Sequence, residues 1–147
     1  MISIFSALSK YPSTPTRSQL ENYTTEALVY LLQLSKNNQS LLLVNFLKLF
    51  GIPFNIKYNK IEISTQESFN TRYGLRSIPD ITIRISNLNN KPKAIYFIEV
   101  KVDSGINKYI TNNKEIDQIK KYQGIISNPP VKKENISLLS KLHFSSQ

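Results

Sequence analysis

Apolar residues recur at helical spacing in the first third of this chain. From residue 18 to about residue 34, Leu, Tyr and Ala side chains fall every three or four positions, which is the period of one helix face. Ser18 and Glu21 have the spacing of a capping box, so we expect the helix to begin there. A second helix is predicted over residues 40–50, because Gly51-Ile52-Pro53 follows it as a stop signal.

Runs of β-branched and aromatic residues replace this pattern in the middle of the chain. Such runs, bounded by Asn, Pro and Gly, are typical of β-strands. We expect strands over residues 56–64, 78–86 and 93–102, then a helix over residues 112–126 and a short final strand over residues 136–144. The order helix, three strands, helix, strand predicts an α/β fold.

The strand predicted over residues 93–102 is apolar at first and ends in charge. Side chains alternate between the two faces of a strand, so Glu99 and Lys101 share one face while every second residue from Ile98 points into the core. The segment before this strand is rich in Asn and contains a proline, which favours a turn. A hairpin closed there brings Asp80, near the start of the preceding strand, beside Glu99.

These residues have the chemistry of a metal-dependent phosphodiesterase. The carboxylates of Asp80 and Glu99, with the backbone carbonyl of Val100, form the hard-oxygen set that Mg²⁺ or Mn²⁺ accepts, and water and a substrate phosphate would fill the other positions. Such an ion lowers the pKa of bound water and stabilises the charge that builds on the phosphate. Lys101, two residues from a ligand, is placed to orient that water or to offset the same charge.

The pattern Pro79-Asp80, followed by Glu99-Val100-Lys101, resembles the PD-(D/E)XK nuclease superfamily, which is restriction-endonuclease-like. In this resemblance Asp80 matches the motif aspartate, Glu99 the second acid and Lys101 the lysine. It implies an αβββαβ core with a central mixed sheet flanked by helices. It also implies a metal-dependent nuclease that hydrolyses phosphodiester bonds of nucleic acid, with DNA as the favoured substrate.

Two further segments extend the resemblance to about residues 18–126. The first predicted helix is similar to one that, in some members, sends a glutamate toward the metal, and Glu26 is its best match. The helix after the lysine strand is similar to the Gln-x-x-x-Tyr pattern of the exonuclease-like branch, which Gln118 and Tyr122 match. Residues four apart share a helix side, so these two can act together on the substrate. Lys121 is grouped with them as a substrate-contacting residue.

Each candidate also has a purely structural interpretation. Asp80 could be an acid at a strand entry, and Glu99 with Lys101 could form an ion-pair ladder on a solvated face. Glu26 could be an ordinary exposed helix acid, and Gln118 and Tyr122 could be surface and core-edge residues of their helix. The apolar run before Glu99 argues against the ladder, because it is typical of a central strand where charges are costly unless they coordinate something or reach a cleft.

Composition narrows the classes of function. The formal net charge is +9, from 19 basic and 10 acidic residues, which suits a polyanionic partner such as nucleic acid. The abundance of Lys, Asn and Ile would also follow from AT-rich coding DNA. The chain has no cysteine and a single histidine, His143, which argues against a disulfide, a thiolate or zinc site and a histidine-based catalytic pair. No apolar run approaches the ~20 residues of a membrane span, so we expect a cytoplasmic protein without membrane contact.

The chain length predicts one domain, residues 18–147, preceded by an irregular lead-in over residues 1–17. About twenty residues follow Ser127, so the domain could be a minimal core or one that is short at its C-terminus. The alternative to an enzyme is a catalytically inert nucleic-acid-binding or scaffolding module of the same fold. Many nucleases of this type act as dimers, so the resemblance permits a homodimer.

Overall fold

The computed structural model describes the backbone of residues 19–37, 41–55, 57–102, 108–111, 114–126 and 136–144. Side-chain surroundings are described for residues 21–36, 41–55, 57–100 and 120–126. The lead-in predicted for residues 1–17 lies outside these ranges. Within them, no helix is long and apolar enough to cross a membrane.

Two helices open the described chain, as the sequence predicted. Helix α2 (Gln19–Asn37) is followed by α3 (Leu41–Leu49). Gly51 ends the second helix in the left-handed conformation, with φ of 65°, and donates its N–H to the carbonyl of Lys48 at 3.0 Å. The N–H of Ile52 bonds to the carbonyl of Leu47 at 2.9 Å, which satisfies another carbonyl of the last turn.

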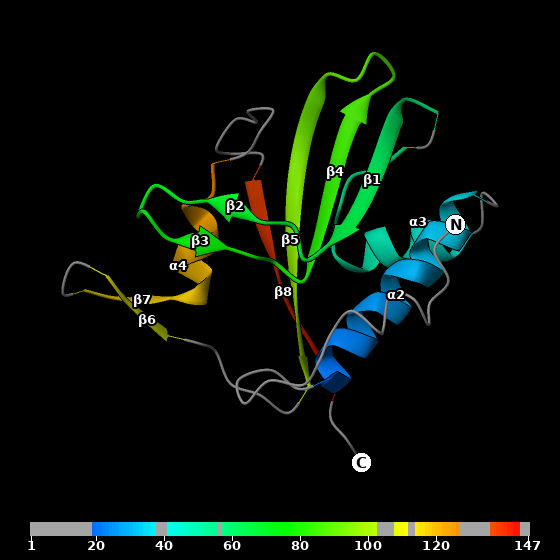
Figure 1. Cartoon of the computed structure of the whole chain (residues 1–147). Coiled ribbons are helices and arrows are strands. Elements are labelled where there is room, and N and C mark those ends of the chain that lie inside the picture. Colours follow the sequence, from blue (N-terminus) through cyan, green and yellow to red (C-terminus); the bar gives the residue numbers. More distant parts are fainter. Residues whose placement is uncertain are drawn as a thin grey trace.

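A four-stranded sheet forms the centre of the fold (Figure 1). Its order is β1 (Asn59–Thr65), β4 (Ile81–Asn87), β5 (Pro92–Val102) and β8 (Ile136–Phe144). Strand β4 is antiparallel to both β1 and β5, whereas β8 lies parallel to β5. The expected α/β class is confirmed, and the final strand lies where the sequence predicted it.

The helix predicted over residues 112–126 is wrong in its first part. Residues 114–117 form strand β7 (Lys114–Asp117), which pairs antiparallel with β6 (Lys108–Thr111), and the helix α4 (Gln118–Gln123) begins only afterwards. The β-branched and aromatic residues of β6 favour an extended backbone, and cross-strand pairing outweighs the local helical pattern. The stretch before Asp80 contains another short hairpin, β2 (Phe69–Asn70) with β3 (Arg76–Ser77).

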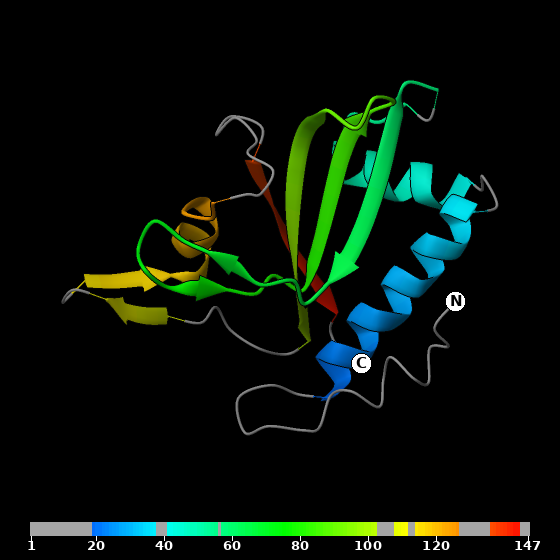
Figure 2. The same ribbon diagram turned by 45° about the horizontal axis from the view of Figure 1, so that its top comes forward.

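The two faces of the sheet pack against different elements (Figure 2). On one face, the isoleucines of β4 and the Ile98 and Val100 side chains of β5 pack with buried residues of α2 and α3. The predicted core orientation of Ile98 and Val100 is therefore confirmed. On the opposite face a second cluster joins the central strands to α4 and the β2–β3 hairpin, and it consists of Phe69, Ile95, Phe97, Tyr122 and Ile125. The polar residues of interest lie on this second face.

Candidate active site

Asp80 is a buried carboxylate held by three hydrogen bonds to its side chain and backbone. It immediately precedes β4 and is 2% exposed. Its Oδ2 accepts the backbone N–H of Val100 at 2.8 Å, and its Oδ1 accepts the amide of Gln66 at 3.1 Å. The N–H of Gln66 also donates to the Asp80 carbonyl at 3.2 Å, and Gln66 has a positive φ of 52°. An uncommon backbone conformation thus supports the orientation of this acid.

Glu99 lies on the adjacent strand, one step beyond the last paired residues. The register pairs Ile81 with Ile98, and Asp80 and Glu99 are the next residues beyond this pair on the two chains. The hydrogen bond from the Val100 N–H to Asp80 Oδ2 shows that the Asp80 carboxylate lies beside this part of β5. Toward β8 the pairing shifts between Ile98 and Val100, so that Glu99 faces two residues of β8. Irregularities of this kind often accompany functional sites, since they change the direction of a side chain.

Glu99 is 8% exposed, and the hydroxyl of Tyr122 donates a hydrogen bond to its Oε2. Tyr122 comes from α4 and is itself 2% exposed. The solvated-ladder interpretation of Glu99 is therefore wrong, because the carboxylate is buried between strand and helix. The structure brings together three of the residues chosen from the sequence: Asp80, Glu99 and Tyr122.

Lys121 is a buried lysine next to this group, with 9% of its surface exposed. Burial lowers the pKa of Lys121 below its ordinary value, and the negative charge of Glu99 partly offsets this effect. The adjacent Lys120 is exposed. The two lysines of α4 therefore differ in kind, and only Lys121 is directed into the protein.

Three other predicted residues have backbone positions that agree with a shared site. Lys101 lies on β5 two residues after Glu99, and Gln118 begins α4 one turn before Tyr122. The side chains of Lys101 and Gln118 lie outside the described residues. Val100 is fully buried and gives its N–H to Asp80, and its carbonyl stays a predicted metal ligand.

Glu26 is partly exposed on α2 and is not gathered with the two acids. Among the described residues, no group of three or more Asp, Glu, His or Cys side chains is arranged to hold a metal ion. The more deeply buried acid of α2 is Glu21, which is 6% exposed. The first turns of α2 lie beside the end of β5 in both Figure 1 and Figure 2.

Sequence reasoning missed Glu21 and Gln66. Glu21 was assigned to a helix cap, although its spacing to Thr25, Val29 and Leu32 places it near the buried side of the helix. No sequence signal marks Gln66, whose role depends on an unusual backbone conformation. Two buried side-chain oxygens close to Glu21 in the sequence, Asn22 Oδ1 and Thr25 Oγ1, have no hydrogen-bond partner within the part of the chain that the structure describes.

The donor set of Asp80 and Glu99 fits a divalent cation of the Mg²⁺ type. Such ions use one or two protein carboxylates and take water and substrate phosphate for the remaining positions. An ionised carboxylate offers about four acceptor sites, so the hydrogen bonds to Asp80 and Glu99 are compatible with metal coordination. On the same strand face, the buried Thr82 Oγ1 has no hydrogen-bond partner among the described residues, which leaves a polar oxygen near Asp80.

Comparison with protein-family models, with curated proteins and with solved structures finds no match. The function is therefore inferred from the residues and their geometry.

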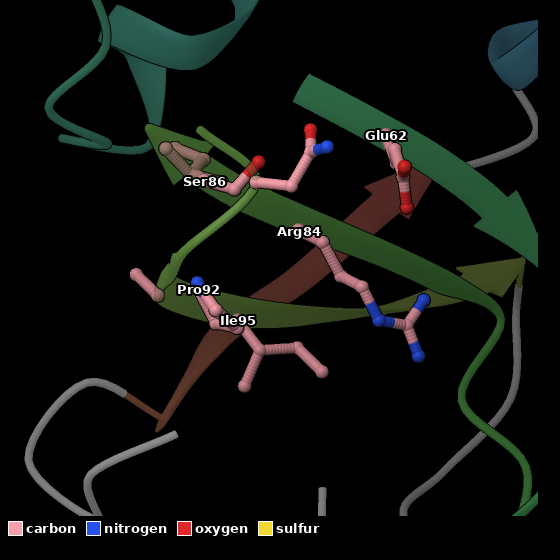
Figure 3. A pocket seen from close by; sticks show the side chains of 8 residues that line it. Glu62, Arg84, Ser86, Pro92 and Ile95 are labelled. Atoms are coloured by element: carbon pink, nitrogen blue, oxygen red, sulfur yellow. The ribbon is translucent and has the colours of Figure 1, made fainter. Parts of the chain in front are cut away.

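A shallow depression of about 210 Å³ lies on the same sheet face, toward the β4–β5 turn (Figure 3). Its lining includes Glu62, Arg84 and Ile95, from three neighbouring strands. Arg84 lies on β4, four residues after Asp80, which is a separation of roughly 13 Å at the usual rise of an extended chain. The two buried acids therefore do not line this depression.

The Arg84 guanidinium is engaged by Glu67 through two hydrogen bonds, one of them 2.6 Å from Nη1 to Oε2. Burial acts to raise the pKa of Glu67, but hydrogen bonds from Arg84 and Ser64 and the charge of Arg84 together lower it below 4.5. Arg84 is thus paired within the protein, and the chemistry of interest stays at the other end of the strand.

Proposed function

We propose that this chain is a metal-dependent nuclease of the PD-(D/E)XK type that hydrolyses phosphodiester bonds of nucleic acid, with DNA as the favoured substrate. The observation that carries the proposal is the pair of buried carboxylates, Asp80 and Glu99, opposite each other at one end of two central strands. Hydrogen bonds from Gln66, Val100 and Tyr122 hold the two carboxylates in place. An ionised carboxylate has about four acceptor sites, so each keeps capacity that a divalent ion could use.

The order of the elements gives further support. Helix α2, strands β1, β4 and β5, helix α4 and strand β8 follow one another along the chain, with helix α3 and the two short hairpins as additions. This order agrees with the αβββαβ core that the resemblance implies. The Tyr122 contact adds to it, because that residue matches the tyrosine of the Gln-x-x-x-Tyr pattern and bonds to Glu99.

In this mechanism Asp80 and Glu99, with the Val100 carbonyl, would hold Mg²⁺ or Mn²⁺. When bound, the ion would acidify a water molecule and neutralise charge on the phosphate. The contacts from Gln66 and the Val100 N–H keep Asp80 in place, so that little reorganisation is needed during the reaction.

Lys101 is proposed to orient the attacking water. The water oxygen gives up a proton to solvent and forms a new bond to phosphorus, one ester bond breaks, and the leaving oxygen takes up a proton from solvent. Tyr122 fixes the Glu99 carboxylate from α4, while Gln118 and Lys121 contact the substrate. Glu26, which does not join a three-acid group, would contribute only through water.

A cleavage assay tests this function. Labelled single- and double-stranded DNA would be incubated with the protein in Mg²⁺, Mn²⁺ or EDTA, beside Asp80→Asn and Lys101→Met variants shown to be folded by circular dichroism. We expect cutting that needs a divalent metal and that each substitution reduces at least 100-fold, as loss of a residue that acts in the transition state commonly does. A folded wild type that cuts neither DNA under any of these conditions would contradict the proposal.

The alternative is an inert nucleic-acid-binding module, and the basic net charge of +9 is the observation in its favour. It predicts binding that weakens with salt and is indifferent to divalent metal. The same assay, run with a binding measurement, separates the two functions.

A further inference from the structure

The β2–β3 hairpin and helix α4 carry positive charge without any acidic residue. Residues 69–77 contain Arg72 and Arg76, and α4 contains Lys120 and Lys121. Both arginines and Lys120 are exposed. Arg72 and Arg76 on the hairpin and Lys120 on α4 therefore present positive charge to solvent from two neighbouring elements.

The hairpin is attached to the end of α4 through the backbone. The N–H of Arg72 donates to the carbonyl of Gly124 at 2.8 Å, and the N–H of Ile126 donates to the carbonyl of Asn70 at 2.9 Å. Thr71 and Ile125 form an antiparallel bridge between these bonds. Figure 1 and Figure 2 both show the hairpin beside α4. The two basic elements are thus one structural unit.

Gly124 allows this close approach. A Cβ atom at this position would lie 2.4 Å from Cε2 of the Tyr73 ring, which is well inside contact distance. The absence of a side chain at Gly124 lets the Tyr73 ring approach the chain directly after α4, and Tyr73 in turn supports Arg72. The Arg72 guanidinium carbon lies 5.1 Å from the Tyr73 ring centroid, and Nη2 donates to the Tyr73 hydroxyl at 3.0 Å.

Arg76 is also held by a neighbour, since its Nε donates to Ser68 Oγ. Within the described residues neither Arg72 nor Arg76 is paired with a carboxylate, whereas Arg84 is paired with Glu67. Held but unneutralised guanidinium groups lose little side-chain entropy when they bind an anion. Their planar geometry suits the oxygens of a phosphate.

This basic unit is packed against the two-carboxylate site. Phe69, at the base of the hairpin, contacts Phe97 with ring centroids 5.3 Å apart, and Phe97 contacts the Tyr122 ring at 6.2 Å. Phe97 precedes Glu99 by two residues on the same strand face, and Tyr122 bonds to Glu99 directly. Continuous packing therefore connects the exposed arginines with the buried acids.

We propose that the β2–β3 hairpin and the exposed side of α4 bind the sugar-phosphate backbone of a nucleic acid next to the Asp80–Glu99 site, through Arg72, Arg76 and Lys120. The choice of nucleic acid rests on the proposed nuclease function, but binding at this surface does not need the metal. Contacts to phosphate position a strand without reading its sequence. The surface is therefore expected to bind strands of different sequence with similar affinity.

The test compares two double variants with the same change in net charge. Arg72→Gln/Arg76→Gln removes the hairpin charges, and Lys91→Gln/Lys93→Gln removes two exposed lysines at the β4–β5 turn, at the other end of the sheet (Figure 1). Each lowers the formal net charge of +9 by two. Binding of a fluorescent 25-nucleotide DNA would be measured by anisotropy in EDTA at four salt concentrations, after circular dichroism confirms that each variant is folded.

We expect the hairpin variant to bind about tenfold more weakly and the turn variant to change less than twofold. The slope of log K against log salt should fall by about 0.7 per lost phosphate contact on a single strand in the hairpin variant alone. If the hairpin variant fails to fold, Arg76→Gln with Lys93→Gln as its control takes its place. Equal losses in the two variants, or no binding by the wild type, would overturn the proposal.

The binding assay is independent of cleavage. A hairpin-specific loss of affinity in a protein that does not cut DNA would refute the nuclease and leave the binding surface intact. Metal-dependent cutting, together with equal losses of DNA affinity in the two double variants, would support the nuclease and overturn the binding surface.

Discussion

The hydroxyl of Tyr122 donates a hydrogen bond to the carboxylate of Glu99 in the interior of the protein. This contact joins α4 to the central strand β5, although 23 residues separate the two along the chain. Because the acid is buried, its orientation is set by the helix as well as by its own strand. Any chemistry that uses Glu99 therefore depends on how α4 is packed.

Replacing Tyr122 by Phe should preserve the ring contact with Phe97 and remove only the hydroxyl. A buried hydrogen bond to a charged group is worth about 1.5–3 kcal/mol, so we expect the free energy of unfolding to fall by about that amount. Cleavage should fall about tenfold, because Glu99 loses one of its supports. Urea denaturation and a cleavage assay measure both effects. The control is Tyr58→Phe, at an exposed tyrosine directly before the edge strand β1. Wild-type stability in Tyr122→Phe would refute the role of this bond.

Lys121 and Lys120 are adjacent lysines with opposite exposure, which makes them a matched pair. Lys121→Met removes a positive charge next to Glu99 and keeps the length of the side chain. We expect cleavage to drop at least tenfold, since a cation in a site shielded from water acts strongly on a developing phosphate charge. Lys120→Met should change the cleavage rate less than twofold at saturating DNA. If the two variants behave alike in single-turnover kinetics, Lys121 is only a structural residue.

The Glu67–Arg84 pair predicts a small pH effect on stability. The pKa of Glu67 is lowered in the folded protein, so the pair stabilises the fold above the unfolded-state value of about 4.5 and this contribution is lost as the pH falls below it. Both groups are partly exposed, so we expect less than about 1 kcal/mol. Glu67→Gln should be less stable than the wild type at pH 7, and the difference should disappear by pH 3 in urea unfolding. A difference that persists at pH 3 would contradict this explanation.

The Asp80–Glu99 neighbourhood could be predicted from the sequence because it depends on two local features. Asn-rich turn residues separate two strongly apolar runs, and alternation along the second run places Glu99 opposite the core residues Ile98 and Val100. Once the hairpin forms, the register of the strands determines which acids become neighbours. The buried face of β5 follows from the same alternation.

Features that depend on distant partners could not be predicted. Residues 114–117 extend a helical pattern in the sequence, yet they pair with β6 as a strand. Whether Glu21 or Glu26 is the more buried acid depends on which side of α2 meets the sheet. A small rotation of the helix about its own axis changes that side. Gln66 supports Asp80 through a positive φ that its residue type does not encode.

Direct measurement of Mn²⁺ binding to the folded protein tests the two-carboxylate site most sharply. Free Mn²⁺ would be followed by electron paramagnetic resonance during titration of the wild type, of Asp80→Asn and Glu99→Gln, and of Glu62→Gln as an exposed-acid control on the same sheet face. We predict that the wild type and Glu62→Gln bind Mn²⁺ alike, and that the two site variants bind at least tenfold more weakly. Equal binding by all four proteins, or none by the wild type, would contradict a metal site formed by Asp80 and Glu99.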